Sequence, residues 1–95
     1  MTIHALETEL KDIQSESAII VSGGKLHILN ESAKKFYEII SNESPEIIRF
    51  IEKVQEFYAE VWQENELEII ADLFELLEQM RKAQLIEFTD SGDIK

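Results

Sequence analysis

The two histidines, His4 and His27, are the residues of this chain that proteins most often use as metal ligands or proton carriers. A metal site needs three or more convergent ligands, and neither histidine belongs to a cluster of His and carboxylate residues at helical spacing. The chain has no cysteine, which excludes disulfides, thiolate metal sites and a cysteine nucleophile. We therefore predict no metal and no cofactor, with His4 in a flexible terminus and His27 on the solvent-facing side of a strand.

The acidic residues are numerous but give no catalytic pattern. The chain has 20 of them, and such residues usually form a solvated face rather than a paired general acid and base. Asp90-Ser-Gly-Asp93 predicts a turn, because a calcium-binding EF-hand loop would need further ligands after it. We therefore predict a protein that is not an enzyme and has no catalytic residue.

The charge balance opposes two classes of partner. Twenty acidic residues against nine basic ones give a net charge of −11, which disfavours nucleic acid phosphates and anionic membrane surfaces. The longest apolar run, Ala18 to Val21, is too short to cross a bilayer, and the first residues lack the apolar core of a signal peptide. We expect a cytoplasmic protein that binds neither nucleic acid nor a membrane.

The first third of the chain predicts strands. Ala18 to Val21 is an apolar run, Lys25 to Leu29 is a β-compatible run of Leu and Ile broken by His27, and Gly23-Gly24 between them supplies the positive φ angles of a tight hairpin turn. Leu10 to Gln14 predicts an earlier strand of the same sheet, although the apolar residues up to Ile13 also fit a helical spacing. If the outer edge of the strand from Lys25 to Leu29 is open, the backbone of another chain could bind there as an additional strand.

Three helices are predicted after the strands. The first covers about residues 31–41, with Asn30 as its N-cap. The second begins with Ser44 as N-cap and Pro45 at its first helical position, and the third covers about residues 66–83. The inward apolar face of the second helix is predicted to hold Ile47, Ile48, Ile51, Val54 and Tyr58, and its spacing extends to Trp62.

These elements predict one domain that spans residues 1–95. Leu85 to Phe88 closes it as a short strand or tail, and the termini, 1–8 and 89–95, are expected to be flexible. The fold class is α+β and winged-helix-like: a three-stranded antiparallel β-sheet followed by three α-helices.

The third helix has a wider apolar surface than one packed face requires. Its apolar side chains cover an arc of roughly 180°, whereas a surface helix usually needs a little over ~100°. The excess flank carries Ile70, Phe74 and Leu77, with Arg81 at its end. Three explanations remain open: the flank packs on the protein's own sheet, forms a dimer interface, or lines a groove for a foreign peptide.

Several short motifs follow one another in a recognisable order. They are Leu29-Asn30-Glu31-Ser32-Ala33, Ser44-Pro45-Glu46-Ile47-Ile48, Asp72-Leu73, Leu76-Leu77, Met80 and Leu85-Ile86-Glu87. In this order the chain resembles, over about residues 10–88, the PqqD-like family, whose members are RiPP recognition elements that capture precursor peptides for ribosomal peptide modification. Gln84 departs from the pattern, because the family usually has glycine there, and the segment 55–66 looks longer than usual.

The resemblance implies a peptide-binding domain that does no chemistry itself. In that family the leader segment of a precursor peptide adds to the third strand of the sheet and rests its side chains against the third helix. At the matching positions, backbone groups would come from Lys25, Leu26, His27, Ile28 and Leu29, and apolar pockets from Ile70, Phe74 and Leu77, with Arg81 available for a leader carboxylate. The bound peptide is then handed to a modifying enzyme, commonly a radical-SAM enzyme, a cyclase or a protease.

Other readings of the chain compete with this one. A DNA-binding winged helix would have a basic recognition helix, and the polar side of the third helix is acidic instead. An acidic adaptor for a basic protein, or a homodimeric regulator that pairs through the wide helix, stays open. Phe57, Tyr58 and Trp62 would form a contact patch in that case, or would pack the second helix into the core. A leader with basic residues would suit the net charge of −11.

Overall fold

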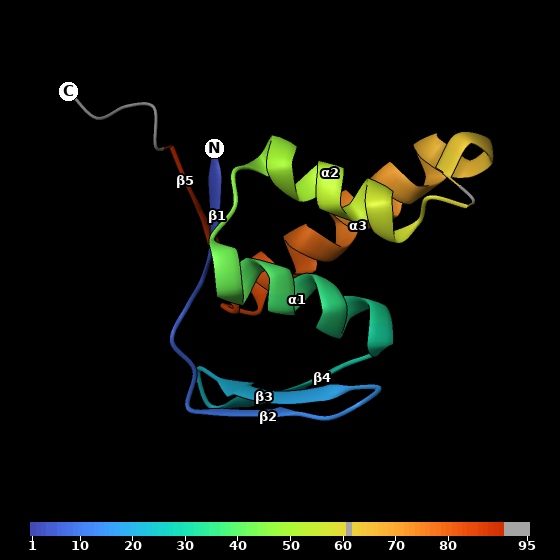
Figure 1. Ribbon diagram of the computed structural model, residues 1–95. Helices are drawn as coiled ribbons and strands as arrows, with labels where there is room; N and C mark the ends of the chain where they lie inside the picture. Colours follow the sequence, from blue (N-terminus) through green and yellow to red (C-terminus); the bar gives the residue numbers. More distant parts are fainter. Residues whose placement is uncertain (61, 91–95) are drawn as a thin grey trace.

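Five strands and three helices make up the part of the chain that this computed structural model describes, residues 1–60 and 62–90 (Figure 1). In chain order the elements are β1 (Thr2–Ala5), β2 (Leu10–Ile13), β3 (Ala18–Ser22), β4 (Lys25–Leu29), α1 (Glu31–Glu43), α2 (Ile47–Phe57), α3 (Trp62–Lys82) and β5 (Ile86–Thr89). The predicted α+β class, a three-stranded antiparallel sheet followed by three helices, is confirmed, and a two-stranded sheet is added to it.

The three-stranded sheet has the order β2-β3-β4, and its second hairpin turns at the two glycines. Gly23 and Gly24 have φ angles of 61° and 77°, which residues with a Cβ rarely adopt. The turn pairs Ser22 with Lys25 and so sets the antiparallel register of β3 and β4. The predicted earlier strand is present as β2, antiparallel to β3.

The first strand, β1, pairs with the last one, β5. Ile3 is completely buried, and its N–H donates to Pro45 O at 2.8 Å. His4 Nε2 lies 2.9 Å from Thr89 Oγ1, 85 residues along the chain. The prediction that residues 1–8 form a flexible terminus containing His4 is therefore wrong. Local periodicity could not show the strand, because its partner is at the other end of the sequence.

The closing segment of the chain also differs in part from its prediction. The short strand or tail expected at Leu85 to Phe88 is a strand, Ile86–Thr89, and its last residue was expected in the flexible terminus. Pairing with β1 gives this strand its hydrogen-bond partners. Residues 91–95, also predicted to be flexible, lie outside the described residues.

Asn30 starts α1 as predicted, because its Oδ1 accepts a hydrogen bond from the N–H of Ala33 at 2.9 Å. The helix runs on to Glu43, beyond its expected end. Ser44 ends this helix instead of starting the next one: its φ of 44° is left-handed, and its N–H donates to Ile40 O at 3.0 Å. The prediction of Ser44 as an N-cap is therefore wrong.

α2 begins at Ile47. The N–H of Ile47 donates a hydrogen bond to the carbonyl oxygen of Met1, just before β1, at 2.8 Å. The buried residues of α2 are Phe50 and Val54. Ile48, expected on the inward face, is 68% exposed, so the helix is rotated from the predicted orientation.

α3 contains a kink at Asn65, whose φ and ψ of −129° and 21° are not helical. The segment before the kink, expected as a connection, is helical from Trp62. Regular helix resumes at Glu66, where the third helix was predicted to begin. The predicted start thus corresponds to the kink.

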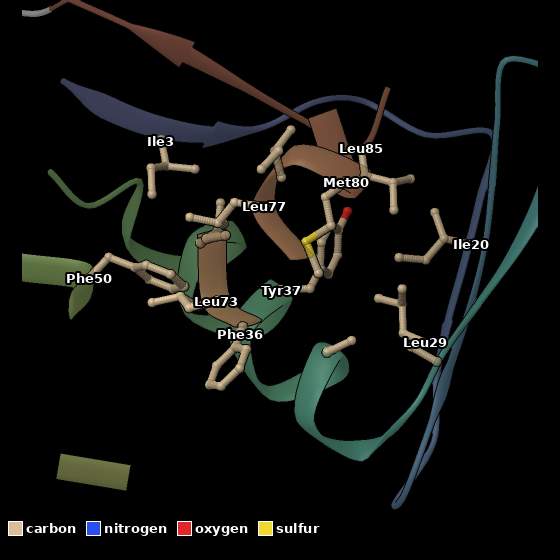
Figure 2. Close-up of a cluster of buried hydrophobic side chains, with 14 of the residues drawn as sticks. Ile3, Ile20, Leu29, Phe36, Tyr37, Phe50, Leu73, Leu77, Met80 and Leu85 are labelled. Carbon is tan, nitrogen blue, oxygen red and sulfur yellow. The ribbon is translucent and has the colours of Figure 1, made fainter. Parts of the chain in front are cut away.

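The core lies between the two sheets and the three helices. In Figure 1, α1 crosses between the three-stranded sheet and the layer that holds α2 and α3. Tyr37 and Ile40 of α1 and Phe50 of α2 are completely buried. Figure 2 shows side chains from β1, β3, β4 and the helices converging on this cluster. The sheet and α3 are therefore held in place by a shared core.

Gln84 lies in the turn just after α3, and replacing it with glycine is expected to stabilise the fold. Its φ of 65° lies in the left-handed region, which costs a residue with a Cβ about 1 kcal/mol. Gln84→Gly should raise the free energy of unfolding by about 1 kcal/mol in urea titrations followed by circular dichroism. Gln79→Gly, inside the same helix, should lower it by a similar amount. Equal losses at both positions would show that the backbone at Gln84 is not strained.

Candidate functional site

The outer edge of β4 is open in the part of the chain that the structure describes. β4 pairs with β3 on one side, and no described strand pairs with its other side. Figure 1 shows the three-stranded sheet at one end of the molecule, away from β1 and β5. The two edges of this sheet, β2 and β4, can therefore be compared as docking edges.

Hydrogen bonding along β4 alternates between its two sides. The two-residue turn makes its flanking residues a hydrogen-bonded pair, so Lys25, His27 and Leu29 direct their N–H and C=O groups toward β3. The N–H and C=O groups of Leu26 and Ile28 point to the open edge instead. Of the predicted backbone partners, only Leu26 and Ile28 can therefore hydrogen-bond a strand added at this edge.

β4 has fewer of the charges by which natural proteins protect sheet edges, because its only Lys, Arg, Asp or Glu is Lys25 at its first position. β2 has Lys11 and Asp12 at its centre, and charged residues on an edge oppose pairing with another chain. From Leu26 to Leu29, β4 has no Lys, Arg, Asp or Glu. The less protected edge of the sheet is thus β4.

The outer face of the three-stranded sheet is mostly apolar, with Asp12 of β2 as its charged residue. The register places Leu26 and Ile28 of β4 on the same face as Ile19 and Val21 of β3 and Leu10 of β2. Leu26 and Ile28 are 61% and 70% exposed. Figure 1 shows the helices on the opposite face of this sheet. A partner could therefore contact apolar side chains beside the open edge.

The residues predicted to line pockets on α3 differ widely in exposure. Leu77 is 1% exposed and belongs to the core, and Ile70 is half-buried against it. Phe74 is 45% exposed. Arg81 Nε donates to Glu78 Oε1 at 3.1 Å, and this hydrogen bond lowers the pKa of Glu78. Phe74 is thus an exposed apolar contact, whereas Arg81 already has a carboxylate partner on its own helix.

An open hollow of about 530 Å³ lies among the start of α1, the end of α2 and the first part of α3, away from Phe74 and Arg81. We call it the helical hollow. It is lined by Asn30, Ser32, Ala33 and Phe36 of the β4–α1 junction and α1, Val54 of α2, Tyr58 just after it, and Asn65, Glu68, Ile69, Asp72, Leu73 and Leu76 of α3. None of the predicted site residues lines the helical hollow, although Asn30 directly follows β4.

Sequence reasoning missed the helical hollow because it treated Glu68 and Asp72 as part of a solvated face. Helical periodicity gives the angle between side chains but not which side of the helix meets its neighbours. The available signal was the spacing: the two carboxylates alternate with Ile69, Leu73 and Leu76. Such a boundary between acidic and apolar side chains marks the rim of the hollow.

Two buried polar atoms, His27 Nε2 and Tyr37 Oη, have no hydrogen-bond partner among the described residues. His27 lies opposite Ile20, which is completely buried, so its ring is on the inner face of the sheet. The prediction that His27 faces solvent is therefore wrong. Burial raises the pKa of the Tyr37 hydroxyl.

The aromatic residues after the middle of α2 pack partly inward. Tyr58 is half-buried, with its ring centroid 6.2 Å from that of Phe36. Phe57 is 45% exposed and lies 6.0 Å from Phe36, under the ammonium group of Lys35 at 5.9 Å. Tyr58 thus packs against the core, and the side chain of Trp62 lies outside what the structure describes.

The described residues contain no group of three His, Cys, Asp or Glu that could hold a metal ion. None of the helices in the same ranges, 1–60 and 62–90, is long and apolar enough to span a bilayer. In comparisons with known proteins, no family model, curated protein or solved structure matches the chain significantly. The open edge of β4 and the helical hollow are the two candidate binding sites of the described residues.

Proposed function

We propose that this domain binds an extended peptide as an additional strand on β4. The observation that carries the proposal is the open edge where Leu26 and Ile28 present two N–H and two C=O groups, on a strand whose only Lys, Arg, Asp or Glu is Lys25 at its start. Backbone hydrogen bonds contribute ~1 kcal/mol each, and ordering the peptide offsets much of this gain. Side-chain contacts must therefore supply most of the affinity and all of the specificity.

The guest that we propose is the leader segment of a ribosomally made precursor peptide. Three antiparallel strands followed by three helices agree with the fold that the resemblance to the PqqD-like family implies. The domain would do no chemistry: it would hold the leader while a radical-SAM enzyme, a cyclase or a protease modifies the rest of the precursor. The domain, the precursor peptide and the modifying enzyme would meet in the cytoplasm, where the precursor is translated.

A display selection tests strand addition without knowledge of the natural leader. Random peptides of about twelve residues, long enough for one strand, are selected on the immobilised protein. Ile28→Pro removes an N–H at the open edge without removing a hydrogen bond to β3. We expect it to lower affinity for the selected peptides by at least about tenfold. Ile13→Pro makes the matching change on the other edge, β2, and should bind as the unmodified protein does.

Hydrogen exchange gives a second measurement of the same binding. A guest strand should protect the amides of Leu26 and Ile28, whereas those of His27 and Leu29 are already bonded to β3. A selection that enriches no peptide would overturn strand addition. Equal binding by the Ile28→Pro variant would overturn it as well.

The apolar outer face of the sheet favours a second function, that of a homodimeric regulator or an acidic adaptor. Leu26 and Ile28 leave that face largely exposed, and exposed apolar patches mark interaction surfaces. Leu26→Lys changes this face while keeping every backbone group of the β4 edge. Sedimentation should show a dimer that this substitution dissociates if the face is an interface. A monomer before and after the change would overturn the homodimer.

A further inference from the structure

We propose that the helical hollow binds an arginine side chain of the guest peptide, beside the segment that pairs with β4. The inference rests on the strand addition proposed above and names the residue that would set its specificity. The occupant is a basic guest, because the charged side chains that line the helical hollow are the carboxylates of Glu68 and Asp72.

The helical hollow lies where a guest strand would leave β4. Asn30, the first residue after β4, lines it together with Ser32. In Figure 1 the start of α1, the end of α2 and the start of α3 lie on the same side of the molecule as this end of β4. Strand residues advance ~3.3 Å each, so a residue about two positions beyond the one opposite Ile28 can reach the hollow.

The walls of the hollow suit the aliphatic part of a long side chain. Ile69 and Leu76, which are half-buried, give it accessible apolar surface. Phe36 and Tyr58 add two aromatic rings whose centroids are 6.2 Å apart. Arginine packs its methylene groups on apolar surface and stacks its guanidinium on aromatic rings. The volume of about 530 Å³ is in the range of ~300–1,000 Å³ that small-ligand sites occupy.

The charged groups that line the hollow are both negative. Glu68 and Asp72 lie one turn apart on α3, and no Lys or Arg of the described chain lines the hollow with them. Neither carboxylate has a hydrogen bond or ion pair with another described residue. Like charges four residues apart on a helix repel one another. A guanidinium between them would gain two acceptors and relieve that repulsion.

Removing each carboxylate tests the inference with the peptides selected on the unmodified protein. The selection should enrich arginine at one fixed position beside the β-compatible segment. Asp72→Asn and Glu68→Gln should each lower affinity for these peptides by roughly tenfold, and should leave affinity unchanged when citrulline, which is uncharged, replaces the arginine. Glu75→Gln removes a carboxylate of the same helix outside the hollow and should have no effect.

The stability of the variants shows whether any loss of binding is specific. Asp72→Asn and Glu68→Gln relieve a repulsion between exposed side chains, so their urea midpoints should equal or exceed that of the unmodified protein. A lower midpoint together with weaker binding of citrulline peptides would overturn the inference, because the carboxylates would then act on the fold.

The outcomes separate the arginine site from strand addition. Selected peptides that need the Ile28 edge but have no basic residue at a fixed position would overturn the arginine site alone. Arginine peptides that bind Ile28→Pro as well as the unmodified protein, yet lose affinity in Asp72→Asn, would support the hollow and overturn strand addition. Equal affinity for arginine and citrulline peptides would overturn the arginine site in either case.

Discussion

Replacing Ile3 with alanine is expected to lower the free energy of unfolding by about 2–5 kcal/mol. Ile3 is completely buried, and Figure 2 shows its side chain facing the cluster that includes Phe50 and Leu77. Truncation would remove apolar contacts and leave a cavity that the surrounding side chains only partly fill. A small domain is stable by only ~5–15 kcal/mol, so urea denaturation should show a large shift of the midpoint.

Ile28→Ala is the matched control for Ile3→Ala, because it makes the same change on a strand residue that is 70% exposed. Its cost should be under ~1 kcal/mol. Deleting residues 1–5 should cost more than Ile3→Ala, because it also removes the β1–β5 pairing and the hydrogen bond from Ile47 to Met1. A truncated chain that unfolds at the same urea concentration as the full one would show that β1 contributes nothing to the folded state.

The parts of the fold that depend on neighbouring residues could be predicted from the sequence. Gly23 and Gly24 adopt the positive φ angles that a tight hairpin requires. Asn30 caps α1 through a side chain that reaches only three residues along the chain. Both features are decided within a few residues, so a local pattern contains enough information to identify them.

The parts that depend on distant residues could not be predicted in this way. β1 is a strand because β5, at the other end of the described chain, supplies its hydrogen-bond partners. Ser44 looked like a helix N-cap from its neighbour Pro45, but Pro45 O accepts a hydrogen bond from Ile3 and α2 starts later. Tertiary pairing overrides the local capping signal at this position.

The candidate site, too, has parts that follow from neighbouring residues and parts that depend on distant ones. The strand from Lys25 to Leu29 and its open edge follow from the hairpin, but the choice of Leu26 and Ile28 as the outward residues needs the register with β3. On α3 the sequence gives the width of the apolar arc but not its rotation against the core. Leu77 is consequently buried, and the hollow lies at Ile69 and Asp72 instead.

Replacing Tyr37 with phenylalanine is expected to stabilise the protein at neutral pH by about 1–2 kcal/mol. Tyr37 is completely buried, and its hydroxyl oxygen has no hydrogen-bond partner among the described residues. A buried hydroxyl without a partner loses its hydrogen bonds to water on folding and gains none in return. Phenylalanine keeps the ring in the core, where the ammonium group of Lys11 lies 5.4 Å from its centre.

The same substitution should also change how stability depends on pH. Burial raises the pKa of Tyr37 above its ordinary value of 10.0, because the phenolate ion is poorly solvated in the core. Above pH 10.0 the unfolded chain releases the hydroxyl proton while the folded chain retains it. The unfolded state then binds fewer protons, so the free energy of unfolding falls as the pH rises.

Urea denaturation at neutral pH and at about pH 11 measures both effects of the Tyr37 substitution. Tyr37→Phe should lose less stability between the two conditions than the unmodified protein, since it has no proton to release at that position. Tyr58→Phe is the matched control, because its ring is only half-buried, and it should keep the alkaline loss caused by Tyr37. If Tyr37→Phe instead destabilises the protein at neutral pH, the hydroxyl must have a polar partner in solution. The cost of burying it would then be offset, and the core beneath the sheet would contain a polar contact that also fixes the position of α1 against β3.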